Sequence, residues 1–232
     1  LYVVYVVVTA QYRGSPLATD MPYLLTFMNE YAPKQFFIQS YTLGIEQKFY
    51  LVWPLVAFAA GAFAFGRRLG VTLGVIAAGL GVFAFVAAAP AVFYLVIMFG
   101  CLLAVVMHDP RGYRFVRPLT HPVVGVVVVL LFVGAQVALG PVVEHGLIAE
   151  PTAILLYGLC VTLLMPVVLA PGPARWVLSL PPMRFVGDRS YSLYLVQFLA
   201  GWTVLEFVKI PAGHRLFIVV AVASVVAADV LY

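Results

Sequence analysis

The sequence predicts an all-α fold, a polytopic bundle of transmembrane helices. Of its 232 residues, 64% are hydrophobic and only 9% are charged, whereas a soluble domain carries roughly a quarter of charged residues. Apolar runs long enough to cross about 30 Å of hydrocarbon recur along the whole chain. They lack the period-two alternation of strands, and only helices and closed barrels satisfy the backbone inside a bilayer. We therefore expect helices surrounded by lipid.

Eight apolar runs have the length of a membrane-crossing helix. Their approximate ranges are 1–12, 42–65, 70–88, 91–107, 121–140, 152–171, 190–208 and 214–232. No transporter-type repeat and no low-complexity linker separates them, so we predict a single membrane domain over residues 1–232. Because the first and last residues lie within apolar runs, we also expect the sequence to be a piece of a longer protein.

Arginines gather in three short turns between these runs. They are Arg67 and Arg68; Arg111, Arg114 and Arg117; and Arg175, Arg184 and Arg189. Basic turns of this kind face the cytoplasm, which places residues 11–40, the longest non-spanning segment, on the outer side. The net charge of +4 then reflects anchoring in the membrane, and we expect no nucleic-acid partner.

We expect no metal site. Cys101 and Cys160 fall within apolar runs, where a free thiol behaves as a small hydrophobic group. The histidines lie at the ends of the runs without the spacing of metal ligands, and we interpret them as surface residues. They are His108, His121, His145 and His214.

The most informative stretch, residues 39–54, leads from the outer segment into the second span. On a helix, its polar and aromatic side chains share one face: Thr42, Glu46, Phe49, Tyr50 and Trp53. An ionisable group within a span costs about 3 kcal/mol and usually faces the bundle interior or a wet cavity. Glu46 therefore either serves a site or caps the helix; Lys48 points away from it, and we expect Lys48 to snorkel to the outer headgroups.

The seventh span carries a second polar face. Its members are Ser190, Tyr194, Gln197 and Gly201. Small and polar residues at this spacing are typical of helix packing, with a substrate site as the alternative. Arg184 and Arg189 flank the start of this helix, where they either anchor the chain or bind an anion such as a phosphate of coenzyme A.

The stretch Tyr41–Pro54, which reads YTLGIEQKFYLVWP, resembles the signature of the acyltransferase-3 family of bacterial membrane O-acyltransferases. That signature typically reads Trp-Ser-Leu-x-x-Glu-Glu-Gln-Phe-Tyr-Leu-x-x-Pro. The matching residues are Leu43, Glu46, Phe49, Tyr50, Leu51 and Pro54. The stretches FGCLLA at 99–104 and FVGDRSYSLYL at 185–195 resemble two further family motifs in the same order.

The resemblance implies a ten-helix core, of which our eight spans would be the last eight. It also implies an activity: transfer of a short acyl group, such as acetyl, from acyl-CoA to a hydroxyl of a sugar, glycan or glycolipid of the cell envelope. The location would be the bacterial inner membrane, among membrane lipids. The donor would be acyl-CoA, with no bound cofactor, and the catalytic histidine would lie upstream of this sequence.

Site roles follow from the same resemblance. A base must deprotonate the acceptor hydroxyl, and Glu46 would orient that histidine and stabilise its charged form, or bind the acceptor. Tyr41, Thr42 and Tyr50 would line the site. Tyr194 and Gln197 are further candidates for substrate binding, and Arg184 and Arg189 for binding acyl-CoA.

Two alternatives stay open, and departures from the family pattern favour the first of them. Tyr41 and Thr42 replace Trp-Ser, Gln47 replaces the second glutamate, and Gln197 stands where a histidine often occurs. Glutamine cannot take up a proton near neutral pH. The chain could therefore be a catalytically degenerate scaffold in the membrane, or a non-catalytic subunit that associates with another membrane protein. A glycan or lipid transporter ranks third, because the spans from residue 70 onward hold almost no charge at mid-membrane.

Overall fold

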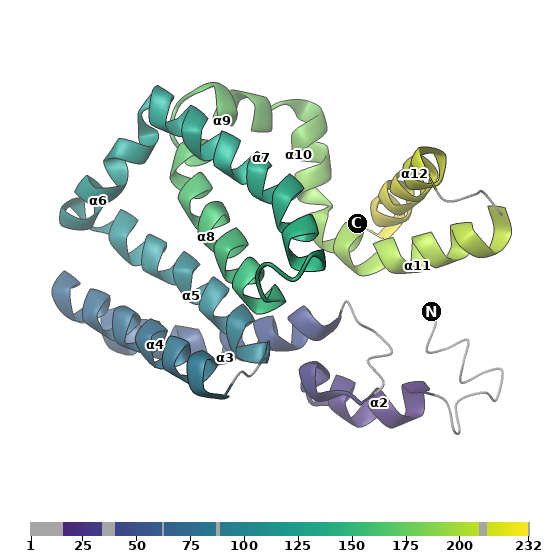
Figure 1. Ribbon diagram of the computed structural model, residues 1–232, viewed down its shortest axis with the longest axis horizontal. Coiled ribbons are helices and arrows are strands. Elements are labelled where there is room, and N and C mark those ends of the chain that lie inside the picture. The colour runs from purple at the N-terminus through teal and green to yellow at the C-terminus, as the bar shows by residue number, and fades with distance from the viewer. Residues whose placement is uncertain (1–15, 34–39, 62, 87–88, 209–212, 232) are drawn as a thin grey trace. The chain divides into compact units, whose positions relative to one another are not determined.

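The computed structural model describes residues 16–33, 40–61, 63–86, 89–208 and 213–231. Throughout these ranges the ordered elements are helices, without a strand (Figure 1). They are α2 (Pro16–Leu25), the 3-10 helix η1 (Asn29–Tyr31), α3 (Ser40–Gly61), α4 (Phe65–Val86), α5 (Ala89–His108), α6 (Pro110–Val116), the 3-10 helix η2 (Arg117–Thr120), α7 (Pro122–Glu144), α8 (Glu150–Leu169), α9 (Pro173–Leu178), α10 (Pro181–Asp188), α11 (Ser190–Val208) and α12 (His214–Leu231). The predicted all-α class is confirmed for this part of the chain, whereas the predicted span 1–12 lies outside it.

Four helices of the described ranges are long and apolar enough to cross a membrane, which indicates a membrane protein. They are Phe65–Phe85, Ala91–His108, Pro122–Glu144 and Glu150–Leu169, and they coincide with the third to sixth predicted spans. The second, seventh and eighth predicted spans are helical as α3, α11 and α12, but these are not among the four. The count of eight spans and the ten-helix core stay predictions.

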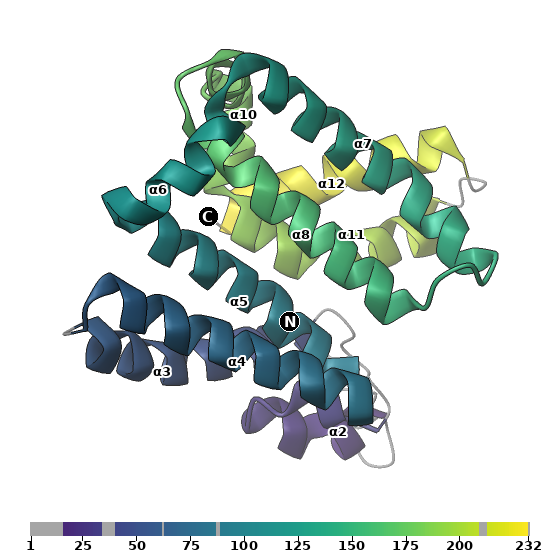
Figure 2. The ribbon, with the colours of Figure 1, turned by 60° about the vertical axis from the view of Figure 1, so that its left-hand side comes forward.

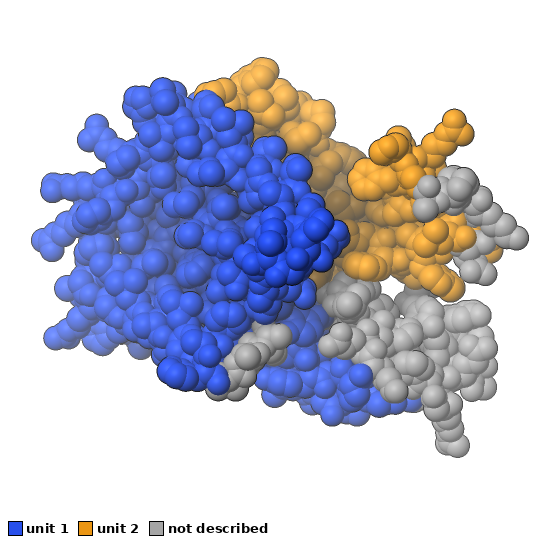
Figure 3. All heavy atoms as spheres, in the orientation of Figure 1, with its two compact units in different colours: residues 1–172 blue, residues 173–232 orange. Residues whose placement is uncertain are grey.

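The chain divides into two compact units, Leu1–Gly172 and Pro173–Tyr232, which are blue and orange in Figure 3. The single membrane domain expected over residues 1–232 stays a prediction. Each unit has its own helix contacts and its own ion pair.

In the first unit, α5 packs against α4 on one side and α8 on the other, and α7 packs on α8 (Figure 2). Helix α3 contacts both α4 and α5. The core cluster of Ile76, Leu95 and Met98 joins α4 to α5. Small residues permit these close approaches: a Cβ on Gly158 of α8 would lie 2.7 Å from Val96 Cγ2 of α5. Such residues let the backbones of membrane helices come together.

The α3–α4 boundary differs from the prediction. Helix α4 begins at Phe65, five residues before the expected start, so Arg67 and Arg68 occupy its first turn rather than a turn between helices. Both amides bond to the Ala64 carbonyl, at 2.9 and 3.2 Å. A helix end tolerates arginine because the long apolar stem stays on the helix while the guanidinium reaches the interface.

The second arginine turn is also folded rather than irregular. Asp109 accepts a 2.8 Å hydrogen bond from the Arg111 amide and is followed by Pro110, the arrangement that starts a helix. The short α6 and η2 result, and they contain all three arginines of that turn.

The segment 11–40 was predicted to be the longest non-spanning stretch, on the outer side. Within residues 16–33 it forms α2 and η1, and η1 packs on α3. The contact is close, since a Cβ on Gly44 of α3 would lie 2.8 Å from the Phe27 carbonyl oxygen. Asp20, Asn29 and Glu30 become buried as a consequence.

The second unit is built on the packing of α11 against α12. Val196 and Val204 of α11 are buried, and Ser224 and Ala228 are buried on α12. A Cβ on Gly201 would meet Val220 at an ordinary contact distance of 3.5 Å. Gly201 therefore takes part in the predicted packing of this helix.

Candidate functional site

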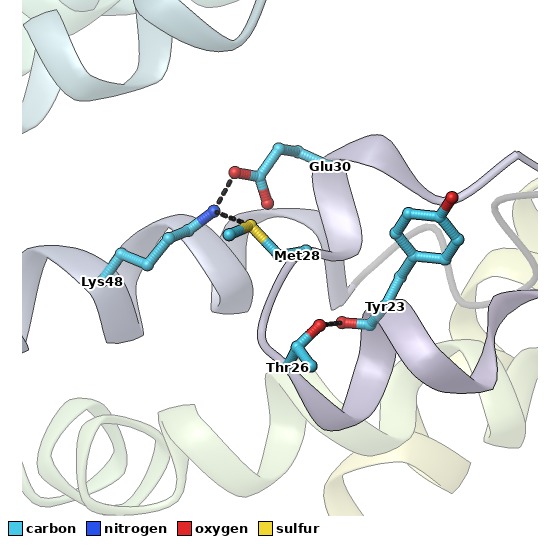
Figure 4. Close-up of polar contacts among 5 residues, drawn as sticks. All are labelled: Tyr23, Thr26, Met28, Glu30 and Lys48. Carbon is cyan, nitrogen blue, oxygen red and sulfur yellow. Dashed lines mark hydrogen bonds and ion pairs between the residues drawn. The ribbon is translucent and has the colours of Figure 1, made fainter.

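Lys48 of α3 forms an ion pair with Glu30 of η1 (Figure 4). The Glu30 side chain is only 1% exposed and that of Lys48 is 25% exposed. The Lys48 ammonium also lies 3.8 Å from the Met28 sulfur and 5.6 Å from the centre of the Tyr31 ring. Lys48 was predicted to snorkel to the headgroups. The structure adds a partner that was not predicted, because η1 brings the Glu30 carboxylate within reach of its ammonium.

Tyrosines surround this ion pair. The Tyr94 hydroxyl of α5 interacts electrostatically with Lys48 and Glu30. Tyr41 packs edge-on against Phe93, with ring centres 5.3 Å apart. Burial and then the charge of Glu30 raise the pKa of Tyr41, which lies just before the predicted span. We call Glu30, Lys48, Tyr31, Tyr41 and Tyr94 the Glu30–Lys48 cluster.

The cluster retains an unused acceptor. One oxygen of Glu30, Oε2, is buried and has no hydrogen-bond partner among the described residues. A buried acceptor without a partner costs about 1–3 kcal/mol. A hydroxyl that reached this oxygen could donate to it and remove that cost.

Glu46 lies half-buried on α3, two residues after Gly44 and on the side of the helix that carries Thr42 and Trp53. The described residues give its carboxylate no hydrogen bond and no ion pair. Thr42 is half-buried as well. Tyr50 is 60% exposed and packs edge-on against Phe49, with ring centres 6.1 Å apart. Of the predicted α3 residues, the structure therefore brings Tyr41 into the Glu30–Lys48 cluster and turns Tyr50 outward.

A cavity of about 430 Å³ lies among α3, α4 and α5, and we call it the α3–α5 cavity. Its lining includes Trp53, Arg68, Thr72, Ile97, Cys101 and His108. The Thr72 hydroxyl donates to the Arg68 carbonyl at 2.9 Å. The Arg68 Nε is buried without a hydrogen-bond partner in the described part of the chain. Glu46 is not a lining residue.

Sequence reasoning assigned Arg68 to membrane anchoring and His108 to the surface. A signal for the cavity did exist on α5, where Ile97, Cys101, Ala104 and His108 follow one another at helical spacing and all line it. The partner helices α3 and α4, however, follow only from the packing.

The predicted residues of the seventh span belong to the second unit. Tyr194 is half-buried, whereas Gln197 and Arg184 are exposed. Arg189 bonds to Asp229 of α12 at 2.5 Å and lies 3.8 Å from the Phe185 ring centre. Its charge is thus matched within the unit, and its binding of acyl-CoA stays a prediction.

No protein-family model, no curated protein and no solved structure matches this chain. Among the residues that the structure describes, no group of three or more His, Cys, Asp and Glu side chains could hold a metal ion. The role of the candidate site is therefore inferred only from the chemistry of its residues.

Proposed function

We propose that this chain is part of a bacterial inner-membrane O-acyltransferase. The enzyme would move a short acyl group from acyl-CoA to a hydroxyl of a sugar, glycan or glycolipid of the cell envelope. The observation that supports this function best is the half-buried carboxylate of Glu46 on α3, on the helix face that also carries Thr42.

The cluster suits the acceptor. Sugar hydroxyls both donate and accept hydrogen bonds, and here Glu30 Oε2 can accept while Lys48 and the tyrosine hydroxyls can donate. Tyr31 is an exposed aromatic ring over which a sugar can lie. The predicted orientation puts this end of α3 on the outer side, where an envelope glycan arrives.

Acyl transfer needs a base at the acceptor hydroxyl. The acceptor oxygen bonds to the acyl carbon, the carbon–sulfur bond to coenzyme A breaks, and the hydroxyl proton passes through the base to the departing thiolate. Glu46 would stabilise a histidine base in its charged form or hold the acceptor. Thr42 lies one turn before Glu46 on the same helix face, so it is close enough to bind the same acceptor. Tyr41 would bind the acceptor from within the Glu30–Lys48 cluster.

The test replaces Glu46 in the full-length protein. Glu46→Gln should lower acylation of envelope glycans by about 100-fold or more, since a positioned acid or base contributes at least that factor. Mass spectrometry of the glycans measures the loss, and membrane fractionation checks that the variant inserts normally.

Glu144→Gln is the matched control, because Glu144 is an exposed carboxylate at the end of α7. It should leave acylation unchanged. Near-normal acylation by Glu46→Gln would remove Glu46 from the mechanism, and absence of acylation with the unaltered protein would favour a non-catalytic scaffold.

A further inference from the structure

The α3–α5 cavity combines an apolar wall with a single strong cation. Trp53, Val71 and Ile97 contribute apolar surface, and Arg68 contributes the charge. None of the described residues that line the cavity is an Asp or Glu. Its volume of about 430 Å³ falls within the range of about 300–1,000 Å³ that small-molecule sites occupy. The expected ligand is therefore an anion with an apolar body.

Arg67 and Arg68 are neighbours in the sequence but lie in different environments. Arg67 is exposed, with its guanidinium 5.5 Å from the centre of the Phe63 ring. Arg68 is half-buried, lines the cavity and keeps a buried Nε without a hydrogen-bond partner among the described residues. The unused donor of Arg68 points to an acceptor that a ligand brings.

The position of the charge within the cavity identifies the ligand further. Arg68 lies in the first turn of α4, and His108 is the last residue of α5, so both are at the predicted cytoplasmic end. Trp53 of α3 and Ile97 of α5 lie several residues before the cytoplasmic ends of their helices, and therefore closer to the membrane interior. A ligand with its anionic group at Arg68 and a chain beside Trp53 has the orientation of a lipid in the inner leaflet.

We propose that the α3–α5 cavity binds one acyl chain of an anionic phospholipid, whose headgroup phosphate is held by Arg68. Basic pockets at the cytoplasmic ends of membrane helices bind such headgroups. The guanidinium suits a phosphate because its planar donors can bond two oxygens at once. This site is independent of the proposed acyl transfer, since it contains neither Glu46 nor the Glu30–Lys48 cluster.

Trp53 provides the measurement. The chain has three tryptophans, so the full-length protein in which Trp176, Trp202 and any tryptophan outside this chain are replaced by Phe reports on Trp53. It is reconstituted in vesicles of phosphatidylcholine with a small fraction of phosphatidylglycerol, and one of the two lipids carries bromine on its acyl chains to quench fluorescence. Brominated phosphatidylglycerol should occupy the site about tenfold more readily than brominated phosphatidylcholine, because the choline cation of the latter already neutralises its phosphate and weakens the charge-assisted contact with Arg68.

Arg68→Gln should reduce this preference to about onefold, while the matched Arg67→Gln should retain it. Gly100→Leu tests the chain-binding part. A Cβ at Gly100 meets nothing within 4 Å and Gly100 lines the cavity, so the leucine should fill it and weaken quenching by both lipids. Gly74→Leu is the control, because Gly74 is equally open but lies outside the cavity.

Equal quenching by the two lipids in the protein that retains Trp53 and has no arginine or glycine substitution would overturn the proposal. So would an equal loss in the two arginine variants, or unchanged quenching in Gly100→Leu. A free fatty acid also combines an anionic group with an acyl chain. A brominated fatty acid added to phosphatidylcholine vesicles tests whether it is the ligand. If it quenches in an Arg68-dependent manner and phosphatidylglycerol does not compete, the ligand is a free fatty acid and the phospholipid proposal fails.

Discussion

The two ion pairs of the described residues differ in burial, and this difference changes what each contributes to stability. In the first unit, Glu30 and Lys48 join η1 to α3, and the carboxylate is only 1% exposed. In the second unit, Arg189 and Asp229 join the start of α11 to α12, and the carboxylate is 50% exposed. A buried charge that loses its partner is strongly destabilising, whereas an exposed pair contributes little. The first pair is therefore needed for the packing of η1 on α3, whereas the second contributes little to the stability of its unit.

Their surroundings reinforce the difference. Around Lys48, the Tyr94 hydroxyl and the Tyr31 ring also interact with the ammonium, so the charges form one network. Arg189 instead retains a contact that is independent of Asp229, because it lies over the Phe185 ring. Removing one partner of each ion pair should therefore affect the two units very unequally.

The largest effect is expected for Lys48→Met. This change leaves Glu30 buried without its cation and should lower the free energy of unfolding by about 3 kcal/mol. Titration with SDS in mixed micelles measures it. The double variant Glu30→Gln with Lys48→Met should recover at least part of the loss, because no buried charge remains. A single variant as stable as the unaltered protein would show that Glu30 reaches water.

An intermediate effect is expected where α3 meets the segment that carries Glu30. Gly44→Ala places a Cβ 2.8 Å from the Phe27 carbonyl oxygen, and such overpacking costs about 1–3 kcal/mol. Gly74→Ala is the matched control on α4, where nothing lies within 4 Å, and it should gain up to about 1 kcal/mol from helix propensity. The same titration compares them, and opposite signs are the expected result.

The smallest effect is expected for Asp229→Asn. The pair is half-exposed, so its loss should cost less than about 1 kcal/mol. Added salt should shrink even this difference, because it screens exposed charges, whereas it should leave the Lys48→Met deficit nearly unchanged. A cost for Asp229→Asn as large as that for Lys48→Met would remove the distinction between the two units.

The apolar runs were sufficient to locate α4, α5, α7 and α8, because a bilayer requires a continuous apolar helix and the run itself contains that information. The ends were less predictable. Arg67 and Arg68 suggested a turn, yet α4 already includes them. A charge near the interface is compatible with either a loop or a first helical turn, and local sequence does not separate these cases.

The candidate site was predictable only in part. Glu46 and Tyr41 could be singled out from one stretch of sequence, and both are partly buried as a site requires. The ion pair of Lys48 was missed because its partner lies eighteen residues earlier, in a segment without a strong helical pattern. Arg68 was missed because a basic turn already had a sufficient explanation in membrane orientation.

Composition and the length of apolar runs thus determined by themselves that this protein is helical and built for a membrane, since hydrocarbon accepts few other structures. Tertiary structure alone decided which polar side chains meet. Successive residues of a helix point about 100° apart, so of the adjacent Arg67 and Arg68 only the second reaches the cavity, once α3 and α5 have packed against α4.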